Sequence, residues 1–366
     1  MNIDSNFPAM AYNCSIKFWR TVSNQQNSRN FRKIFMAAFG SLFMPEMAIT
    51  WFDGDNWSPT EVVASDSISF HPGAHVLHYS STCFEGLKAF RHADGSVKIF
   101  RMDKNIERFA QSSRLLGLPE IDKAQTQQMI ESIVRQYAAD VPEPPGSMYI
   151  RPTHIGTEPA IGKAAVPSVT SCQYILLSPV GDYFAGGDKA LRLLVDDEAM
   201  RCPPHMGMIK SGGNYAAAMG PILNAKAQYQ ADQVLFCPGG DVQETGAANF
   251  LLIDGNQIIT KALDESFLHG VTRDSILTLA RDLGMDVQER QLSVEELLER
   301  AAKPGCEAAL SGTAAVLAPV GTLIYKDREY KVGNGGIGET TVKLRRALND
   351  IQWGKAEDPH GWLTHL

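Results

Sequence analysis

The stretch QVLFCPGGDVQETGAANFLLIDGN, residues 233–256, contains two short apolar runs, and a turn follows each of them. The runs Gln233–Cys237 and Asn249–Ile253 have the length and composition of strands. Pro238-Gly-Gly-Asp241 and Asp254-Gly-Asn256 are typical of the tight turns that join hairpins. The stretch therefore predicts paired strands in the second half of the chain.

Helical segments lie on both sides of these strands. Met102–Leu116 is predicted to be a helix that Asp103 can cap, and Thr272–Leu283 is amphipathic. Ser293-Val-Glu-Glu296 has the pattern of a capping box and opens a further helix. Ser96–Arg101 alternates like a half-buried strand. Hairpins with segregated helices predict an α+β fold and not a doubly wound parallel sheet.

Length and composition divide the chain into parts. The 366 residues suffice for about two domains, and 44% hydrophobic with 20% charged residues excludes a mostly disordered chain. We expect an N-terminal extension at 1–46, a small domain at 47–177 and a large domain at 191–366. The Pro- and Gly-containing stretch 178–190 is predicted to be the loop between the two domains.

The net charge limits the kinds of binding partner, and the cysteine pattern limits the kinds of cellular compartment. The net charge of −7 argues against a general nucleic-acid-binding protein, because phosphate contacts need a basic field. No run of about 18 apolar residues occurs, so we expect no membrane span. The six cysteines are scattered without a Cys-x-x-Cys pair, which favours free thiols in a reducing compartment and a cytoplasmic protein.

The first 46 residues differ from the rest. Residues 5–45 lack Asp and Glu, and a basic cluster that includes Arg29 and Arg32 precedes the apolar run 34–44. A mitochondrial-type targeting segment is one interpretation of this composition. The interpretation that we favour is a flexible tail, or an upstream start with the functional chain beginning near Met44 or Met47.

Two motifs match a metal-binding or a nucleotide-binding pattern, but their surroundings in the sequence argue against both functions. His71, His75 and His78 are close in sequence, but a Pro-Gly pair interrupts any helix that would align them, and no acidic residue is near. Gly333-Asn-Gly-Gly-Ile-Gly338 matches a dinucleotide-binding pattern, yet too little chain follows it to complete such a fold. We expect no metal site, and we interpret 333–338 as a surface turn.

Lys210, in the segment MIKSGGNY (208–215), is the most informative single residue. Small neighbours leave room for another group to approach its amine. In an apolar pocket the charged form of a lysine is disfavoured, which frees the amine for Schiff-base chemistry. Taken by itself, such a segment is also compatible with an exposed loop lysine, which is the commoner case.

Three further segments carry suitable partner groups. Glu244 lies at a turn between two apolar strands, where a buried carboxylate needs a cationic partner such as a protonated pyridine nitrogen or an arginine. Thr272 opens a predicted helix after Gly270, and amides at a helix N-terminus suit phosphate. Leu310-Ser-Gly-Thr-Ala-Ala315 is another small-residue turn with free amides.

Taken in order, these segments resemble the branched-chain amino acid aminotransferases, which are pyridoxal-phosphate enzymes of fold type IV. The resemblance runs from about Phe52 to the C-terminus, and Tyr149-Ile-Arg-Pro-Thr153 and Ser178-Pro-Val-Gly181 look like the longer, eukaryote-like subgroup. The other matching motifs are His78-Tyr79, Phe84-Glu-Gly-Leu-Lys-Ala-Phe90, Phe100-Arg101, Ile155-Gly-Thr-Glu-Pro159, Lys210 to Tyr215, Glu244-Thr-Gly246, Gly270-Val-Thr-Arg273 and Ser311-Gly-Thr-Ala314.

The resemblance implies roles in binding the cofactor, pyridoxal 5′-phosphate. Lys210 would link to the cofactor aldehyde and move the proton between Cα and C4′ as the catalytic acid and base. Glu244 would pair with the pyridine nitrogen, and Tyr215 would hydrogen-bond the 3′ oxygen. The phosphate would be held by the side chains of Arg101 and Thr272 and by the amides of Val271, Thr272 and Thr313.

The resemblance also implies a substrate pocket. Phe84, Tyr149 and Tyr183 would line it, and Arg151 would orient the tyrosines or contact the second carboxylate of glutamate. The amides of Thr313 and Ala314, together with Tyr79, would bind the α-carboxylate. The substrates would be Leu, Ile and Val with 2-oxoglutarate. One departure is Ala247, where family members usually carry a hydroxyl residue.

The family further implies a small N-terminal α/β domain, a larger cofactor-binding domain with a β-barrel-like core, and a homodimer in which a partner loop helps to close the site. The same fold hosts D-amino acid aminotransferases, (R)-amine aminotransferases and aminodeoxychorismate lyase. Lys210 and Glu244 do not separate these activities, whereas Tyr149-Ile-Arg151 and Ser178–Phe184 favour the branched-chain class.

Overall fold

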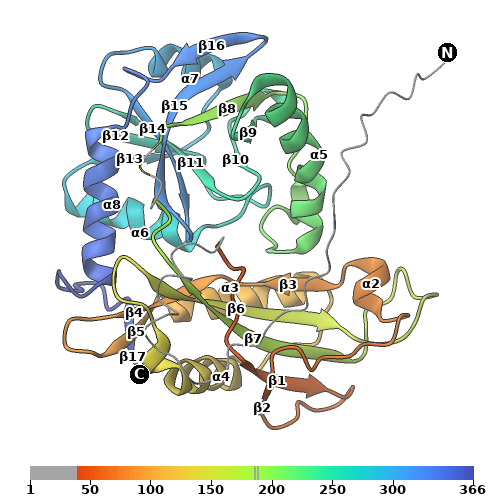
Figure 1. Cartoon of the computed structure of the whole chain (residues 1–366). Helices are drawn as coiled ribbons and strands as arrows, with labels where there is room; N and C mark the ends of the chain where they lie inside the picture. The colour runs from red at the N-terminus through yellow and green to blue at the C-terminus, as the bar shows by residue number, and fades with distance from the viewer. Residues whose placement is uncertain (1–38, 185–186, 188) are drawn as a thin grey trace, which may run out of the picture.

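The computed structural model describes residues 39–184, 187 and 189–366. Two sheets dominate it, one in each half of the chain, and they lie one above the other in Figure 1. The mixture of sheets and helices confirms the predicted α+β class. In the described ranges, no helix is long and apolar enough to cross a membrane.

The lower sheet belongs mainly to the first half of the chain. It has eight strands in the order β17-β5-β4-β6-β7-β1-β2, with β3 paired to β6. Their bounds are β1 Glu46–Phe52, β2 Glu61–Ala64, β3 Thr82–Phe84, β4 Leu87–Arg91, β5 Val97–Phe100, β6 Ser147–Gly156, β7 Ser171–Val180 and β17 Leu363–His365.

Helices flank this sheet. The short α2 (His75–Tyr79) precedes β3, and α3 (Met102–Leu115) and α4 (Lys123–Gln136) follow β5, with the single 3-10 turn Ala138–Asp140 after α4. Met129, Ile130 and Ile133 of α4 are fully buried against alternate residues of the strands. The apolar face of α4 therefore covers the outer side of the lower sheet. The other side of this sheet meets the second half of the chain.

The upper sheet has nine strands in the order β10-β9-β8-β15-β14-β11-β12-β13, with β16 paired to β15. A pairing between β10 and β11 closes six of them into a barrel, as the family resemblance implies. The bounds are β8 Leu191–Asp196, β9 Gln233–Phe236, β10 Glu244–Thr245, β11 Asn249–Asp254, β12 Gln257–Thr260, β13 Asp286–Glu289, β14 Glu307–Gly312, β15 Val316–Tyr325 and β16 Arg328–Lys331.

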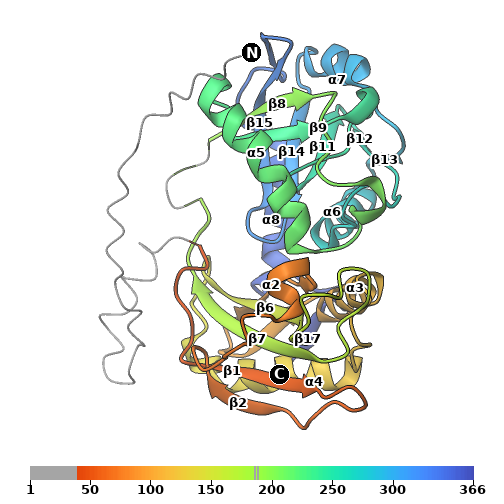
Figure 2. The same ribbon diagram turned by 90° about the vertical axis from the view of Figure 1, so that its right-hand side faces the viewer.

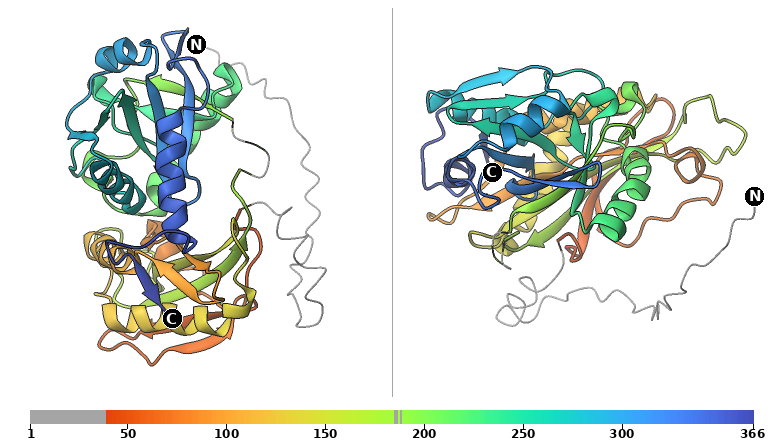
Figure 3. Two further views of the ribbon diagram at one scale, coloured as in Figure 1. Left: turned by 90° about the vertical axis from the view of Figure 1, so that its left-hand side faces the viewer. Right: turned by 90° about the horizontal axis from the view of Figure 1, so that it is seen from above.

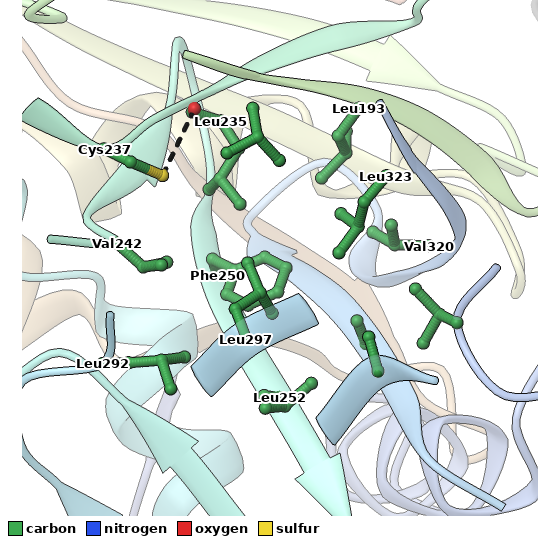
Figure 4. Packing of buried hydrophobic residues seen from close by; sticks show 14 of the residues in the cluster. Leu193, Leu235, Cys237, Val242, Phe250, Leu252, Leu292, Leu297, Val320 and Leu323 are labelled. Atoms are coloured by element: carbon green, nitrogen blue, oxygen red, sulfur yellow. Dashed lines mark hydrogen bonds between the residues drawn. The ribbon is translucent and has the colours of Figure 1, made fainter. Parts of the chain in front are cut away.

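Four helices pack around the barrel. They are α5 (Gly212–Tyr229), α6 (Val271–Asp282), α7 (Val294–Ala301) and α8 (Glu339–Gln352), and the 3-10 turns Pro204–Met206 and Pro238–Gly240 lie between the strands. Figure 4 shows Phe250 and Leu252 of β11 beside Leu297 of α7, in a cluster that also takes in Leu193 and Leu323. All five side chains are at most 1% exposed, so this cluster is the core of the upper half.

A second core joins the two halves. Phe90 of β4 and Phe100 of β5 pack with Leu344 and Leu348 of α8, together with residues of α6 and β15. Figure 3 (left) shows α8 running toward the lower sheet and the C-terminus among its strands. The last strand, β17, pairs with β5, so the chain returns to the small domain after residue 362 instead of ending in the large one.

The predicted elements are largely confirmed, with differences at their ends. The strand at 96–101, the helices at 102–116 and 272–283 and the strands of the opening stretch all form within one or two residues of their expected bounds. Only half of the capping box is present: Ser293 accepts a bond from the Glu296 amide, while the Glu296 carboxylate is bonded to Arg290 and Arg300. Asp103 does not cap its helix: α3 starts at Arg101 in a left-handed conformation without a side-chain cap.

Candidate active site

Lys210 lies between the two halves of the molecule, directly before α5. Its amide donates to the Ser112 hydroxyl (3.1 Å), and its carbonyl accepts from the Phe84 amide (3.0 Å). Both partners belong to the small domain, which fixes the lysine backbone across the domain boundary. The Lys210 ammonium donates to the Tyr215 hydroxyl at 2.9 Å. The amine and the phenol that the sequence singled out are therefore brought together.

Tyr215 is placed by the first turn of α5, where Ser211 is the N-cap and accepts a bond from Gly213. The Lys210 ammonium lies 5.5 Å and the Arg201 guanidinium 5.8 Å from the centre of the Tyr215 ring. Burial opposes ionisation of the phenol, but these two cations outweigh it and lower the pKa of Tyr215. The hydroxyl is thus a strong hydrogen-bond donor beside the lysine amine.

Glu244 on β10 is 2% exposed, and both of its carboxylate oxygens accept hydrogen bonds. One carboxylate oxygen accepts from the Arg201 guanidinium (2.7 Å) and from the Leu268 amide (2.8 Å), and the other accepts from the Asn249 side chain (3.1 Å). Burial raises the pKa of Glu244, and Arg201 opposes this shift more than any other group. The arginine was not foreseen among the site residues.

The N-terminus of α6 faces the same region. Its N-cap is Gly270, without a side-chain cap, and Val271 and Thr272 form the first turn. A Cβ at residue 270 would lie 2.0 Å from the Asn249 side-chain oxygen, so only glycine fits there. Across the domain boundary, the Thr313 hydroxyl donates to the Gly86 carbonyl (3.1 Å). Val271, Thr272 and Thr313 line one small shared cavity.

Arg101 is placed beside this helix, but its guanidinium is occupied. It donates to the Asp274 carboxylate (2.8 Å) and to the Ser275 hydroxyl (2.9 Å), and it lies over the Trp362 ring. These partners are one turn into α6. That Arg101 helps to hold the cofactor phosphate stays a prediction, and in this structure its guanidinium is bonded to the Asp274 and Ser275 side chains instead.

Arg108, seven residues later on α3, lies closer to the helix end and was missed in the sequence. Its guanidinium donates twice to the buried Glu85 carboxylate (2.7 and 2.8 Å) and once to the His269 carbonyl (2.8 Å), next to Gly270. It also influences the pKa of Glu244, as a cation of the same cleft. The available signal was an arginine on the helix that the sequence predicts directly after Arg101.

An aromatic cavity of about 360 Å³ opens beside Lys210. Phe84, Tyr149 and Arg151, three of the residues predicted to contact substrate, line it together with Phe39 from the segment before β1. The Arg151 guanidinium donates to the Tyr149 hydroxyl (2.9 Å) and stacks 4.5 Å from the Phe84 ring centre. Its Nε atom is buried and has no hydrogen-bond partner among the described residues.

Other predicted substrate residues lie elsewhere. Tyr183 is half-exposed and lines a second cavity of about 360 Å³ together with Lys88 and Ala314. Tyr79 on α2 donates its hydroxyl to the Ile161 carbonyl and lines neither cavity. One chain therefore brings Phe84, Tyr149 and Arg151 together at one cavity, whereas Tyr183 and Ala314 line a second cavity and Tyr79 lines neither.

The histidines at 71–78 and the glycine motif at 333–338, which the sequence analysis did not assign to a functional site, are also located in the structure. His75 is bonded to Ser81 and to backbone carbonyls, and His78 to the Pro72 carbonyl. Within the described ranges, no group of three or more His, Cys, Asp or Glu side chains could hold a metal ion. Residues 333–338 form the turn between β16 and α8.

The donor set matches pyridoxal phosphate. An amine beside a phenol suits the cofactor aldehyde and its ring oxygen, a buried carboxylate suits a ring N–H, and uncapped helix-end amides suit a phosphate. The Ser311 hydroxyl, buried on β14 opposite Asn249, has no partner among the described residues and adds one further donor.

Comparison with known proteins gives the same answer. The model of the amino-transferase class IV family matches residues 82–322. The chain belongs to this family. It is 40% identical to a probable branched-chain-amino-acid aminotransferase of Streptomyces coelicolor, over 90% of this chain and 92% of the relative. It is 37% identical to the branched-chain-amino-acid aminotransferase of Mycobacterium tuberculosis, over 95% and 97% of the two chains.

Solved structures of branched-chain amino acid aminotransferases have the same fold. The T.th. enzyme with pyridoxamine 5′-phosphate superimposes with a TM-score of 0.72 at 26% identity, over 87% of this chain and 97% of that one. The complex of that enzyme with N-(5′-phosphopyridoxyl)-L-glutamate gives a TM-score of 0.70 at the same identity. The family and the fold class inferred from the sequence are thus confirmed.

Proposed function

We propose that this class IV aminotransferase uses pyridoxal 5′-phosphate to transfer the amino group of Leu, Ile or Val to 2-oxoglutarate, giving branched 2-oxo acids and L-glutamate. The arrangement that supports the proposal best is the cleft in which the Lys210–Tyr215 pair and the Glu244–Arg201 pair meet the aromatic cavity. The relatives and solved structures are named as branched-chain amino acid aminotransferases.

The cofactor, when bound, supplies an electron sink that makes the substrate Cα–H acidic. Lys210 would hold the cofactor aldehyde and would carry the substrate proton on its amine, and the Tyr215 hydroxyl would keep that amine oriented. Glu244 must be a carboxylate to accept a hydrogen bond from the ring nitrogen, and Arg201 favours that form although the site is buried.

The phosphate is assigned to the amides of Val271, Thr272 and Thr313 and the Thr272 hydroxyl. Arg108 supplies the nearest guanidinium to that helix end, through its bond to the His269 carbonyl. Arg101, which the family resemblance brought forward, instead holds α6 in place through Asp274 and Ser275. An anion at the helix end is favoured by the helix dipole as well as by the free amides.

The substrate side chain is assigned to the aromatic cavity. Phe84 and Tyr149 provide the apolar wall that a branched aliphatic chain requires, and Arg151 adds one placed cation for the second carboxylate of glutamate. The Nε of Arg151, which has no partner among the described residues, is available for that contact. The α-carboxylate is assigned to the amides of Thr313 and Ala314.

We also propose a homodimer and a cytoplasmic location. Large apolar side chains are exposed on one side of the molecule, among them Leu77 of α2 (62%) and Leu223 of α5 (57%), and Figure 2 shows both helices on that side. Tyr79 lies on the same face and would complete a site with the help of a partner loop. The five described cysteines are all free and buried, which fits a reducing compartment.

Spectroscopy and turnover test the activity. Purified protein should show a visible absorbance band that borohydride bleaches, with the cofactor then fixed covalently on Lys210. It should also turn over L-Leu, L-Ile and L-Val with 2-oxoglutarate. Lys210→Ala should fold, with a thermal midpoint within a few degrees of the wild type, but lose the band and turnover. Activity with only D-Ala or an (R)-amine would contradict the substrate assignment, and the absence of the band would contradict the cofactor.

Light scattering tests the dimer. The wild-type protein should have twice the mass of one chain in solution. The Leu223→Asp variant should have a lower mass, closer to that of a single chain. Leu263→Asp is the matched control, because Leu263 is similarly exposed (52%) but does not lie on α2 or α5. A wild-type protein with the mass of a single chain would overturn this assignment.

A further inference from the structure

Lys88 is a cation of the cleft to which no role has been given. It lies on β4 opposite Tyr149 of β6, and successive residues of a strand point to opposite faces. Its neighbours Leu87 and Ala89 are buried in the core under α4, so Lys88 points toward the large domain. The lysine therefore shares a face with Tyr149 and Arg151, the side chains of the aromatic cavity.

The Lys88 ammonium meets the turn to which the substrate α-carboxylate was assigned. It donates to the Ala314 carbonyl at 2.9 Å, and the Thr313 hydroxyl donates to Gly86, two residues before Lys88. It also lies 5.9 Å from the centre of the Phe39 ring, which in turn packs edge-on against Tyr149 (5.0 Å). The ammonium thus lies between the 313–315 turn and the aromatic wall.

The charge of Lys88 lacks an ionic partner. Its hydrogen bond goes to a neutral carbonyl, and within the described ranges no carboxylate lies within salt-bridge distance of it. Asp182 is the acidic group that influences it, from a distance, while Glu85 is occupied by Arg108. Burial lowers the pKa of Lys88 to about 8. A half-buried ammonium without a counter-ion is costly in free energy, and a ligand carboxylate would relieve that cost.

We propose that Lys88 binds the α-carboxylate of the amino acid substrate, together with the amides of the 313–315 turn. The inference rests on the proposed function and extends it to a residue outside the sites assigned above. Two ammonium protons remain after the bond to Ala314, enough for a charge-assisted contact with the carboxylate. A competing possibility is that Lys88 only holds the turn in place by its bond to the carbonyl.

Two substitutions separate the effect of the Lys88 charge from that of its hydrogen bond to the Ala314 carbonyl. Lys88→Gln can still donate to the Ala314 carbonyl but has no charge, whereas Lys88→Arg keeps the charge. The probes are 4-methylpentanoate, which has the leucine skeleton without the amino group, and its neutral amide 4-methylpentanamide. Their dissociation constants are measured by calorimetry on the cofactor-loaded protein, with Lys98→Met on the adjacent strand β5 as the control.

In the wild type the acid should bind at least about tenfold more tightly than the amide, the strength expected of a charged hydrogen bond. Lys88→Gln should abolish that preference and raise KM for leucine, while Lys88→Arg and the control should keep most of it. Thermal midpoints show that each variant folds, and Lys88→Gln and Lys88→Arg both keep a donor for the Ala314 carbonyl.

The possible failures are distinguishable. If the wild type turns over leucine and Lys88→Gln keeps the preference for the acid, Lys88 does not bind the carboxylate and only the role of this residue is overturned. If the wild type neither turns over leucine nor prefers the acid, the proposed function is overturned, and the role of Lys88 falls with it.

Discussion

A few adjacent residues singled out Lys210 and Glu244, whereas Tyr215 was named through the family resemblance, and the roles of all three stay predictions. The small neighbours of Lys210 and the strand turn around Glu244 are local features of the chain. The arginines that complete the site are not local in this way. Arg201 lies 43 residues from Glu244, and Arg108 lies 23 residues from Glu85. Only folding pairs these charges, so a single sequence does not indicate which arginine is used.

Arg201 is predicted to set the charge of Glu244. Arg201→Met leaves a buried carboxylate without its cation, so Glu244 should become protonated, the cofactor should bind at least about tenfold more weakly, and the protein should lose about 3 kcal/mol of stability. Equilibrium dialysis of pyridoxal phosphate and urea unfolding of the cofactor-free protein measure the two effects. Arg201→Lys should recover part of both.

The double variant Arg201→Met with Glu244→Gln tests the physical reason. Removing both charges should restore most of the lost stability, because no unpaired charge remains buried. Cofactor affinity should stay low, since the neutral amide does not stabilise a charged ring nitrogen. An Arg201→Met protein with wild-type cofactor affinity would show that Arg201 does not support Glu244.

At the scale of elements, amphipathic helices and capped ends were predictable, and a helix without a distinct apolar face was not. α3, α6, α7 and α8 each have one apolar face that the spacing of their residues indicates. α5 begins with Gly212-Gly213, contains Pro221 and has small residues on most of its surface, so it has no distinct apolar stripe. β17 is three residues long and forms only because β5 offers an unpaired edge.

The charge cluster at α7 gives a prediction for acid stability. Glu296 accepts bonds from Arg290 and Arg300, and these interactions, with Arg290 contributing most, lower the pKa of Glu296 from 4.5 to about 2. A folded-state pKa below the unfolded value stabilises the protein above about pH 4.5, and this contribution is lost as the pH falls toward 2.

Glu296→Gln should therefore lower the thermal midpoint at pH 7 and have progressively less effect between pH 4.5 and 2. Differential scanning calorimetry at several pH values measures the difference between the variant and the wild type. Glu299→Gln, on the same helix, is the control, since the described structure gives Glu299 no ion pair. A wild-type–variant difference that stays constant down to about pH 2 would show that the arginine contacts do not stabilise the folded state.

At the scale of the whole molecule, the active site depends on the seam between the two halves. Lys210 is bonded to Ser112 and Phe84 of the small domain, and the 313–315 turn is bonded to the β4 edge. The sequence predicted two domains but not how firmly they pack, because the seam consists of apolar residues from β4, β5, α6 and α8 that are distant in sequence. Because both halves contribute residues to this shared core, the cleft between them requires both halves to be folded.

The apolar core between the two halves is predicted to make them unfold together. Phe90, 3% exposed on β4, packs in this core against α8, and Phe90→Ala should lower the free energy of unfolding by about 3–5 kcal/mol.

The fluorescence of two tryptophans measures the unfolding of each half. Trp57 of the small domain and Trp353 after α8 report on the two halves through single-tryptophan variants. Their urea transitions should coincide in the wild type and shift together in Phe90→Ala, whereas Leu115→Ala, at an exposed site, should leave both in place. Two separated transitions in the wild type would mean that each half folds alone and that the cleft forms only by docking.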